Sequence, residues 1–162
     1  MYEEQFMARA LSLSAQALDT PGTEPFGAVV VQDGRIVGEG FNHSVANFDP
    51  TSHGEIEAIR DACKRLARVE LTGCDLYTSC EPCALCLAAM HIVGIRRLFY
   101  AASLEQSDAA IGALPPKERH PIDVAALRVA AATPVGGGAL PAQQHGADEA
   151  VRILRTWAQA RG

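Results

Sequence analysis

The sequence predicts an α/β fold of three layers, in which helices cover both faces of a mixed β-sheet. Three observations lead to this prediction. Runs with helical apolar spacing alternate with short β-branched runs over the first 102 residues. An Asp33-Gly34 pair separates two of the short runs, as in a hairpin. A strand, a helix and a second strand then follow within residues 75–101, and this unit requires parallel pairing.

Length and charge limit the class of protein. The chain has 162 residues, with 14 Lys and Arg against 19 Asp and Glu, so its formal net charge is −5. This length suits one domain, for which we expect a core over residues 1–112 and a divergent C-terminal tail over residues 113–162. The acidic balance disfavours a protein that mainly binds nucleic acid. The apolar run 84–95 is too short to cross a bilayer, and the first residues carry no basic region typical of a secretory signal.

The N-terminal third predicts a helix followed by a hairpin. Apolar side chains recur with helical spacing over residues 3–18, and Pro21-Gly22 ends that pattern. The runs 28–31 and 36–37 predict two antiparallel strands joined by the Asp-Gly turn.

The middle third predicts two helices and two strands. After a polar loop, Thr51 or Ser52 is placed to cap a helix that begins at His53 and ends near residue 68. Residues 75–79 predict a strand, and Pro82 suits the first position of a helix over residues 82–93. Gly94 would end that helix, and residues 97–101 predict the last strand.

The tail is less regular. Residues 134–141 are rich in Pro and Gly and predict a flexible linker. Residues 147–160, which include Trp157, predict an amphipathic closing helix. That helix packs either on its own domain, which is the commoner arrangement, or on a partner subunit.

The cysteines indicate a metal or catalytic site. There are five, and three of them lie within residues 80–86. In a chain without an export signal, such a cluster is typical of metal binding or catalysis rather than of disulfides. We therefore expect a cytoplasmic protein.

One imidazole and two thiols have the spacing of a zinc site. Cys83 and Cys86 are three residues apart at a helix start, so their sulfurs share one face, and the helix dipole favours thiolates. His53 begins the preceding helix, and the two helix N-termini can meet at one sheet edge. The set His53, Cys83 and Cys86 would bind one Zn²⁺ and leave its fourth position open for water.

Glu55 is the candidate proton carrier. It lies two residues beyond His53, roughly 200° around a helix, so it can approach a bound water from another side than the metal ligand. A carboxylate in that place can take a proton from the water and pass it to a leaving group.

Two other functions of the cysteines are possible from the sequence. Cys80 could complete a closed structural zinc site with His53, Cys83 and Cys86, or it could form a redox pair with Cys83. The closed site leaves Glu55 without a role, and the redox pair leaves His53 without one. The open catalytic site gives a role to all four residues and is therefore preferred.

The H-x-E and P-C-x-x-C motifs are those of zinc-dependent nucleobase deaminases. Over about residues 1–102 the chain resembles the cytidine deaminase-like superfamily, and within it the bacterial guanine deaminases. The segments that carry the resemblance are Pro25–Val29, Gly40–Asn42, Asp49–Thr51, Tyr77–Cys83 and Phe99–Ala102, together with His53 and Glu55.

The resemblance implies a hydrolytic deaminase that releases ammonia from a ring carbon, with one zinc per chain and commonly a homodimer. It implies that Glu55 protonates a ring nitrogen and then the amine. It also implies that Asn42 hydrogen-bonds the ring, that Phe26 lines the pocket, and that the Gly54 main chain lies against the base.

The chain departs from the family in three places, one of which is the aromatic residue near the family's C-terminus, which has no clear match here. Gly54 replaces the usual alanine, which would leave more room beside the ring. Residues 112–115 replace an acidic Gly-Phe-Asp-Asp stretch, and Asp108 or Glu118 is a candidate for its proton-transfer role. We expect residues 103–146 to carry the substrate lid.

Guanine is the first candidate substrate, and several alternatives stay open. Cytosine, isocytosine and amino-triazines share the same amidine carbon. The tRNA adenosine deaminases share both motifs, but the acidic charge and the lack of a basic C-terminal helix favour a free small base. A non-catalytic zinc module is the alternative from another class. We expect no membrane and no nucleic-acid partner.

Overall fold

The computed structural model describes residues 1–115 and 119–161, so Glu118 lies outside the described residues. The chain divides into two compact units, Met1–Leu127 and Arg128–Gly162, and the expected core–tail boundary falls within the first. The predicted order of helices and strands is confirmed up to residue 102. No helix in the described part of the chain combines the length and the apolar character needed to cross a bilayer.

The first unit is built on a mixed four-stranded sheet, which confirms the predicted fold class. The strand order is β2-β1-β3-β4. Strand β1 (Glu24–Gln32) pairs antiparallel with β2 (Arg35–Asn42) and with β3 (Asp75–Cys80), and β3 pairs parallel with β4 (Arg97–Ala102). Because β2 and β3 both run opposite to β1, they run in the same direction and end at the same edge of the sheet.

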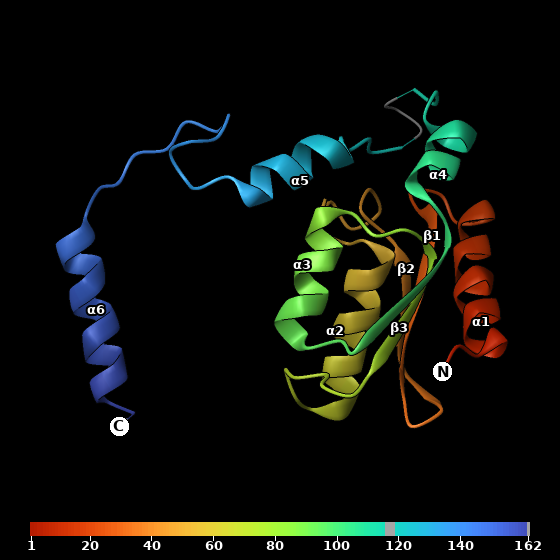
Figure 1. The fold of residues 1–162 in the computed structure, drawn as a ribbon, viewed down its shortest axis with the longest axis horizontal. Helices are drawn as coiled ribbons and strands as arrows, with labels where there is room; N and C mark the ends of the chain where they lie inside the picture. The colour runs from red at the N-terminus through yellow and green to blue at the C-terminus, as the bar shows by residue number, and fades with distance from the viewer. Residues whose placement is uncertain (116–118, 162) are drawn as a thin grey trace. The chain divides into compact units, whose positions relative to one another are not determined.

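Helices cover both faces of this sheet, as Figure 1 shows. Val29 and Val31 of β1 pack against α1 (Glu4–Ala15), whereas Ala28 and Val30 of the same strand pack on the opposite side. The residues on that side contact α2 (Gly54–Leu66) and α3 (Ala84–Val93). The alternation follows from the two-residue repeat of a strand, and it gives β1 two buried faces.

Helices α2 and α3 both begin later than predicted. The N-cap of α2 is His53, which makes no side-chain capping bond, and Ser52 instead donates a hydrogen bond to Glu57. The N-cap of α3 is Cys83, so Pro82 precedes the helix rather than occupying its first position. The predicted caps were therefore wrong, and the side chains of the two actual N-cap residues, His53 and Cys83, face each other. Gly94 ends α3 as predicted, with a φ of 79° that favours glycine.

Asp75 joins β3 to the segment that follows α3. It is 6% exposed and accepts hydrogen bonds from both Arg96 and Arg97. Burial acts to raise the pKa of Asp75, but the two guanidinium groups outweigh it and hold that pKa below its usual range. A carboxyl with a lowered folded pKa stabilises the fold above its unfolded pKa of about 4, and this contribution is lost as the pH falls through the folded pKa.

The chain beyond β4 contains two helices that were not predicted, α4 (Leu104–Ile111) and α5 (Val124–Ala132). A capping box between Ser103 and Gln106 starts α4, and this Ser-x-x-Gln spacing is a sequence signal that was overlooked. The predicted closing helix is confirmed as α6 (Ala147–Gln159). The Pro- and Gly-rich segment 134–141 forms no helix or strand.

Candidate active site

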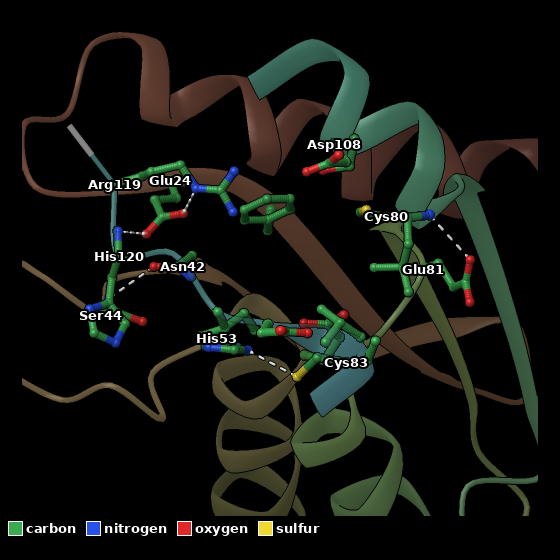
Figure 2. A pocket seen from close by; sticks show the side chains of 18 residues that line it. Glu24, Asn42, Ser44, His53, Cys80, Glu81, Cys83, Asp108, Arg119 and His120 are labelled. Carbon is green, nitrogen blue, oxygen red and sulfur yellow. Dashed lines mark hydrogen bonds and ion pairs between the residues drawn. The ribbon is translucent and has the colours of Figure 1, made fainter. Parts of the chain in front are cut away.

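The three predicted metal ligands lie together. His53 Nδ1 is 3.6 Å from Cys83 Sγ and 3.4 Å from Cys86 Sγ, and the two sulfurs are 3.8 Å apart. These residues meet because β2 and β3 end at the same sheet edge and are followed there by the starts of α2 and α3. Figure 2 shows His53 facing Cys83 across this gap.

The spacing of the three donor atoms fits zinc. With Zn–S bonds of about 2.3 Å and Zn–N bonds of about 2.0 Å, tetrahedral geometry places two sulfurs about 3.8 Å apart and sulfur and nitrogen about 3.5 Å apart. The observed separations of 3.8, 3.6 and 3.4 Å match these values. In the described part of the chain this group has three members, so a tetrahedral ion would keep one position for another ligand.

The protonation of the cysteines also suits a cation. The hydrogen bond between the Cys83 and Cys86 sulfurs is the largest influence on the Cys83 thiol, and together with the hydrogen bond to His53 it lowers the pKa of Cys83 to about 4. The same hydrogen bond, together with burial, raises the pKa of Cys86, which keeps its proton. Contact with Cys83 raises the pKa of His53. A divalent cation would replace the shared proton and hold both sulfurs as thiolates.

Glu55 lies beside the cluster without belonging to it. Its side chain is buried, with 5% of the residue exposed. Thr78 Oγ1 donates a hydrogen bond to Oε1 at 3.2 Å, and Cys86 Sγ donates to Oε2 at 3.4 Å. Burial raises the pKa of the Glu55 carboxyl, which favours its protonated form. The carboxyl group is therefore oriented beside the cluster and can both hold and release a proton.

Cys80 does not join the ligand group. Among the described residues the cluster consists of His53, Cys83 and Cys86 alone, and all five cysteines are free. Cys80 is buried, and burial raises the pKa of its thiol, the opposite of what a redox nucleophile needs. The geometry thus disfavours both the closed zinc site and the redox pair.

The cluster opens into a cavity of about 460 Å³, within the usual size range of small-ligand sites. Phe26, Asn42 and Asp108, three of the expected substrate contacts, line it. Half of the described lining residues come from the stretch between Leu104 and Ala125, in which no helix or strand was predicted. The described lining comprises Glu24, Phe26, Asn42, Ser44, His53, Glu55, Cys80, Glu81, Cys83, Leu104, Ser107, Asp108, Arg119, His120, Ile122, Asp123, Val124 and Ala125.

Gly54, the fourth expected contact, is not among the lining residues. A Cβ atom at this position would lie 2.2 Å from the carbonyl oxygen of Phe26. The glycine therefore lets β1 approach the first turn of α2 closely. The room that was expected beside the substrate ring is occupied by the strand, and the prediction of a wider pocket at this point was wrong.

Glu24 and Arg119 are among the polar lining residues that were missed from the sequence. Glu24 Oε1 accepts a hydrogen bond from the His120 main chain at 3.0 Å, and Glu24 Oε2 lies 4.0 Å from Arg119 Nε. Figure 2 shows these three residues on one side of the pocket. The one sequence signal for Glu24 is that it directly precedes the Pro25–Val29 motif. Arg119 lies in a stretch that carries no such motif.

One side-chain atom of Asn42, Oδ1, is hydrogen-bonded within the protein. Its Oδ1 accepts a hydrogen bond from the Ser44 main chain at 2.9 Å, which identifies the other end of the amide as Nδ2. No hydrogen bond of that Nδ2 is formed within the described residues, and Asn42 lines the cavity. Asn42 can therefore donate hydrogen bonds to a ligand.

The chain is similar to deaminases of known sequence and structure. Residues 1–102 match the model of the cytidine and deoxycytidylate deaminase zinc-binding region. The chain is 46% identical over 110 residues to guanine deaminase of Bacillus subtilis, covering 68% of this chain and 69% of that protein. It is 40% identical over 112 residues to the tRNA-specific adenosine deaminase of Haemophilus influenzae, covering 68% of this chain and 64% of the relative.

A solved structure extends the similarity to nearly the whole chain. The X-ray structure of guanine deaminase from Bacillus subtilis aligns with a TM-score of 0.83 and 34% identity, covering 98% of this chain and 95% of that one. The matched region, residues 1–102, contains the three clustered residues His53, Cys83 and Cys86. It also contains Glu55. The chain belongs to the family of the cytidine and deoxycytidylate deaminase zinc-binding region.

Proposed function

We propose that this protein is a zinc-dependent hydrolytic deaminase of a free nucleobase, with guanine as the first candidate substrate. The observation that carries the proposal is the three-ligand cluster, which adjoins a buried carboxyl group and a cavity of small-ligand size. A structural zinc module needs neither the cavity nor Glu55. The similarity to guanine deaminase over nearly the whole chain supports guanine over other bases.

In the proposed reaction, water replaces the exocyclic amine of the base and ammonia leaves. Bound zinc would supply hydroxide at neutral pH by lowering the pKa of a coordinated water. Glu55 accepts a proton from the attacking water and delivers it to the ring nitrogen beside the reacting carbon. Glu55 then takes the proton of the hydroxyl group formed on the ring carbon and delivers it to the amine, so that the C–N bond breaks, ammonia leaves and the carbonyl group forms. Thr78 holds Glu55 Oε1 in place, and burial protects these transfers from bulk water.

Other lining residues would orient the base. We assign Asn42 Nδ2 as a donor to an acceptor atom of the ring, because its Oδ1 already accepts from Ser44. Phe26 would provide an apolar wall. Asp108 is exposed and lines the same cavity, so it is the candidate second proton carrier in place of the missing acidic pair.

The charge of the pocket favours a neutral base over a nucleotide or a nucleic acid. Its described lining carries five carboxyl side chains and one arginine. A phosphate group close to these carboxylates would be repelled, whereas a base without phosphate is not. The carboxyl groups belong to Glu24, Glu55, Glu81, Asp108 and Asp123.

We also propose that the chain forms a homodimer. Helix α6 carries an apolar stripe in which Val151, Leu154 and Trp157 are 41%, 66% and 59% exposed. Exposed apolar stripes of this kind mark interaction surfaces. Sedimentation equilibrium is expected to give twice the chain mass, and Leu154→Glu is expected to shift the protein towards monomers. A wild-type monomer at micromolar concentration would contradict the proposal.

We propose that the protein is located in the cytoplasm, because free cysteines are typical of a reducing compartment. All five are free, and the proposed catalysis needs two of them as thiolates. Oxidation of Cys83 and Cys86 to a disulfide would remove two zinc ligands.

The first test is ammonia release by the zinc-loaded protein from a panel of bases. The panel contains guanine, guanosine, cytosine, isocytosine, adenine, an amino-triazine and a tRNA anticodon stem-loop. We expect turnover of guanine to xanthine and none of the tRNA substrate. Turnover of only a pyrimidine or a triazine would reassign the substrate. If zinc is bound and no compound of the panel releases ammonia, the proposed function is overturned.

A further inference from the structure

A buried ion pair forms one wall of the pocket, apart from the residues of the proposed proton transfer. Glu24 is 6% exposed, and the Arg119 side chain is 15% exposed. The Arg119 guanidinium donates from Nη1 to the main-chain oxygen of Ile111 at 3.2 Å, so it is held from both sides. In Figure 2, Glu24 and Arg119 lie on the opposite side of the pocket from Cys83.

This wall contains unsatisfied polar atoms. Within the described residues, two buried side-chain nitrogen or oxygen atoms lack a hydrogen-bond partner, Ser44 Oγ and Arg119 Nε. Both belong to residues that line the cavity. The 4.0 Å between Arg119 Nε and Glu24 Oε2 is an ion-pair distance but too long for a hydrogen bond. Buried donors without acceptors are rare in folded proteins, and at a binding site they point to a ligand that supplies the acceptors.

We propose that Arg119 reads the edge of the substrate that faces away from the reacting carbon, and that this edge carries two adjacent acceptors, such as O6 and N7 of a 6-oxopurine. The inference rests on the proposed function, because it names the substrate class of the same pocket. The guanidinium carries five donors and no acceptor, so it pairs with a carbonyl oxygen and a ring nitrogen and rejects an amino group in place of that oxygen. The fork to O6 and N7 is the commonest specific arginine contact with guanine.

The charges of the wall favour a neutral ligand. Arg119 already faces the Glu24 carboxylate, and the remaining charged lining is acidic. A carboxylate or phosphate ligand would therefore meet more negative than positive charge. A neutral base with two acceptors can accept hydrogen bonds from the Arg119 guanidinium without adding charge.

Glu24 is a positioning residue in this scheme. Its Oε1 is held by the His120 main chain, which fixes the carboxylate against Arg119. Glu24→Gln keeps the shape and the acceptor for His120 but removes the charge. We expect it to weaken guanine selectivity in the same direction as loss of Arg119, and by less.

The test compares three bases in the zinc-loaded full-length protein. 2,6-Diaminopurine replaces O6 of guanine by an amino group, and 7-deazaguanine replaces N7 by C–H. The values of kcat/KM are measured for all three with wild type, Arg119→Met and the control Arg35→Met, which changes an exposed arginine outside the pocket lining. Zinc content and far-UV circular dichroism establish that each variant is folded.

Wild type is expected to prefer guanine over both analogues. Arg119→Met should lower kcat/KM for guanine by about tenfold to a hundredfold, with little change for 2,6-diaminopurine, because one bidentate pair is lost. Arg35→Met should leave all three values unchanged. Equal losses for all three bases in Arg119→Met would indicate a structural role and overturn the inference.

The inference and the proposed function fail separately. Guanine turnover without any preference over the two analogues overturns the role of Arg119 and leaves the deaminase intact, even if the Arg119 variant does not fold. If wild type deaminates none of the three, the proposed function is overturned. The dissociation constants of the same bases then decide the inference, and equal constants for guanine and 2,6-diaminopurine overturn it.

Discussion

The Glu55→Gln variant is expected to lose deamination by about 10³-fold while keeping one zinc per chain, since proton transfer by a positioned side chain contributes on this scale. The amide has nearly the shape of the carboxyl group and can still accept the hydrogen bond from Thr78. It cannot carry a proton from water to the ring nitrogen and the amine. The measurement is steady-state kcat on guanine, or on the best base of the panel, together with zinc analysis by mass spectrometry.

A matched control separates this effect from a general loss of carboxylate charge. Glu70→Gln changes an exposed residue that is not part of the pocket lining, and it is expected to keep both activity and zinc. If Glu55→Gln kept activity within a few-fold of wild type, Glu55 would not be the proton carrier. If the variant lost zinc, its inactivity would report on the metal site instead.

The Cys83→Ala variant is expected to lose zinc and with it all measurable deamination. It leaves one thiol and one imidazole, too few ligands to hold zinc in competition with a chelator. Since zinc binds the folded chain, wild type should gain thermal stability when zinc is added, and the variant should not. Zinc content after dialysis against a weak chelator and the unfolding temperature with and without zinc are the two measurements.

Two further cysteine variants make this test specific. Cys63→Ala removes a partly buried thiol outside the cluster and should keep the full zinc content. Cys80→Ser should also keep zinc, because Cys80 is not a member of the ligand group. Loss of zinc from Cys80→Ser would favour the closed four-ligand site and count against an open catalytic position. Full activity of Cys83→Ala would contradict the metal site itself.

The regular elements up to residue 102 were predictable because their signals are local. The continuous apolar run of β1, the Asp33-Gly34 turn and Gly94 after α3 act over a few positions, and the structure follows them. The exact helix starts were not predictable in the same way. Ser52 has the chemistry of a cap, but its hydroxyl group bonds Glu57, and α2 begins one residue later than predicted.

The same distinction between local signals and long-range contacts applies to the candidate site. The types and spacing of His53, Glu55, Cys83 and Cys86 are enough to predict a zinc ligand set and a proton carrier, because the chemistry resides in the side chains and in the starts of two helices. Helix α4 also had a local signal in its Ser-x-x-Gln box. The position of Gly54 against Phe26 had none, since it depends on how closely β1 approaches α2.

By itself, therefore, the sequence determined the reaction chemistry: the cluster ligands, the carboxyl group beside them, and the order of helices and strands that carries both. Only the tertiary structure decided the shape and polarity of the pocket. Glu24 and His120 are 96 residues apart along the chain, and their hydrogen bond places Arg119 in the wall opposite Cys83. Such a contact depends on where strand β1 and the segment after α4 meet in space, and no periodicity or short motif in either segment specifies that meeting point.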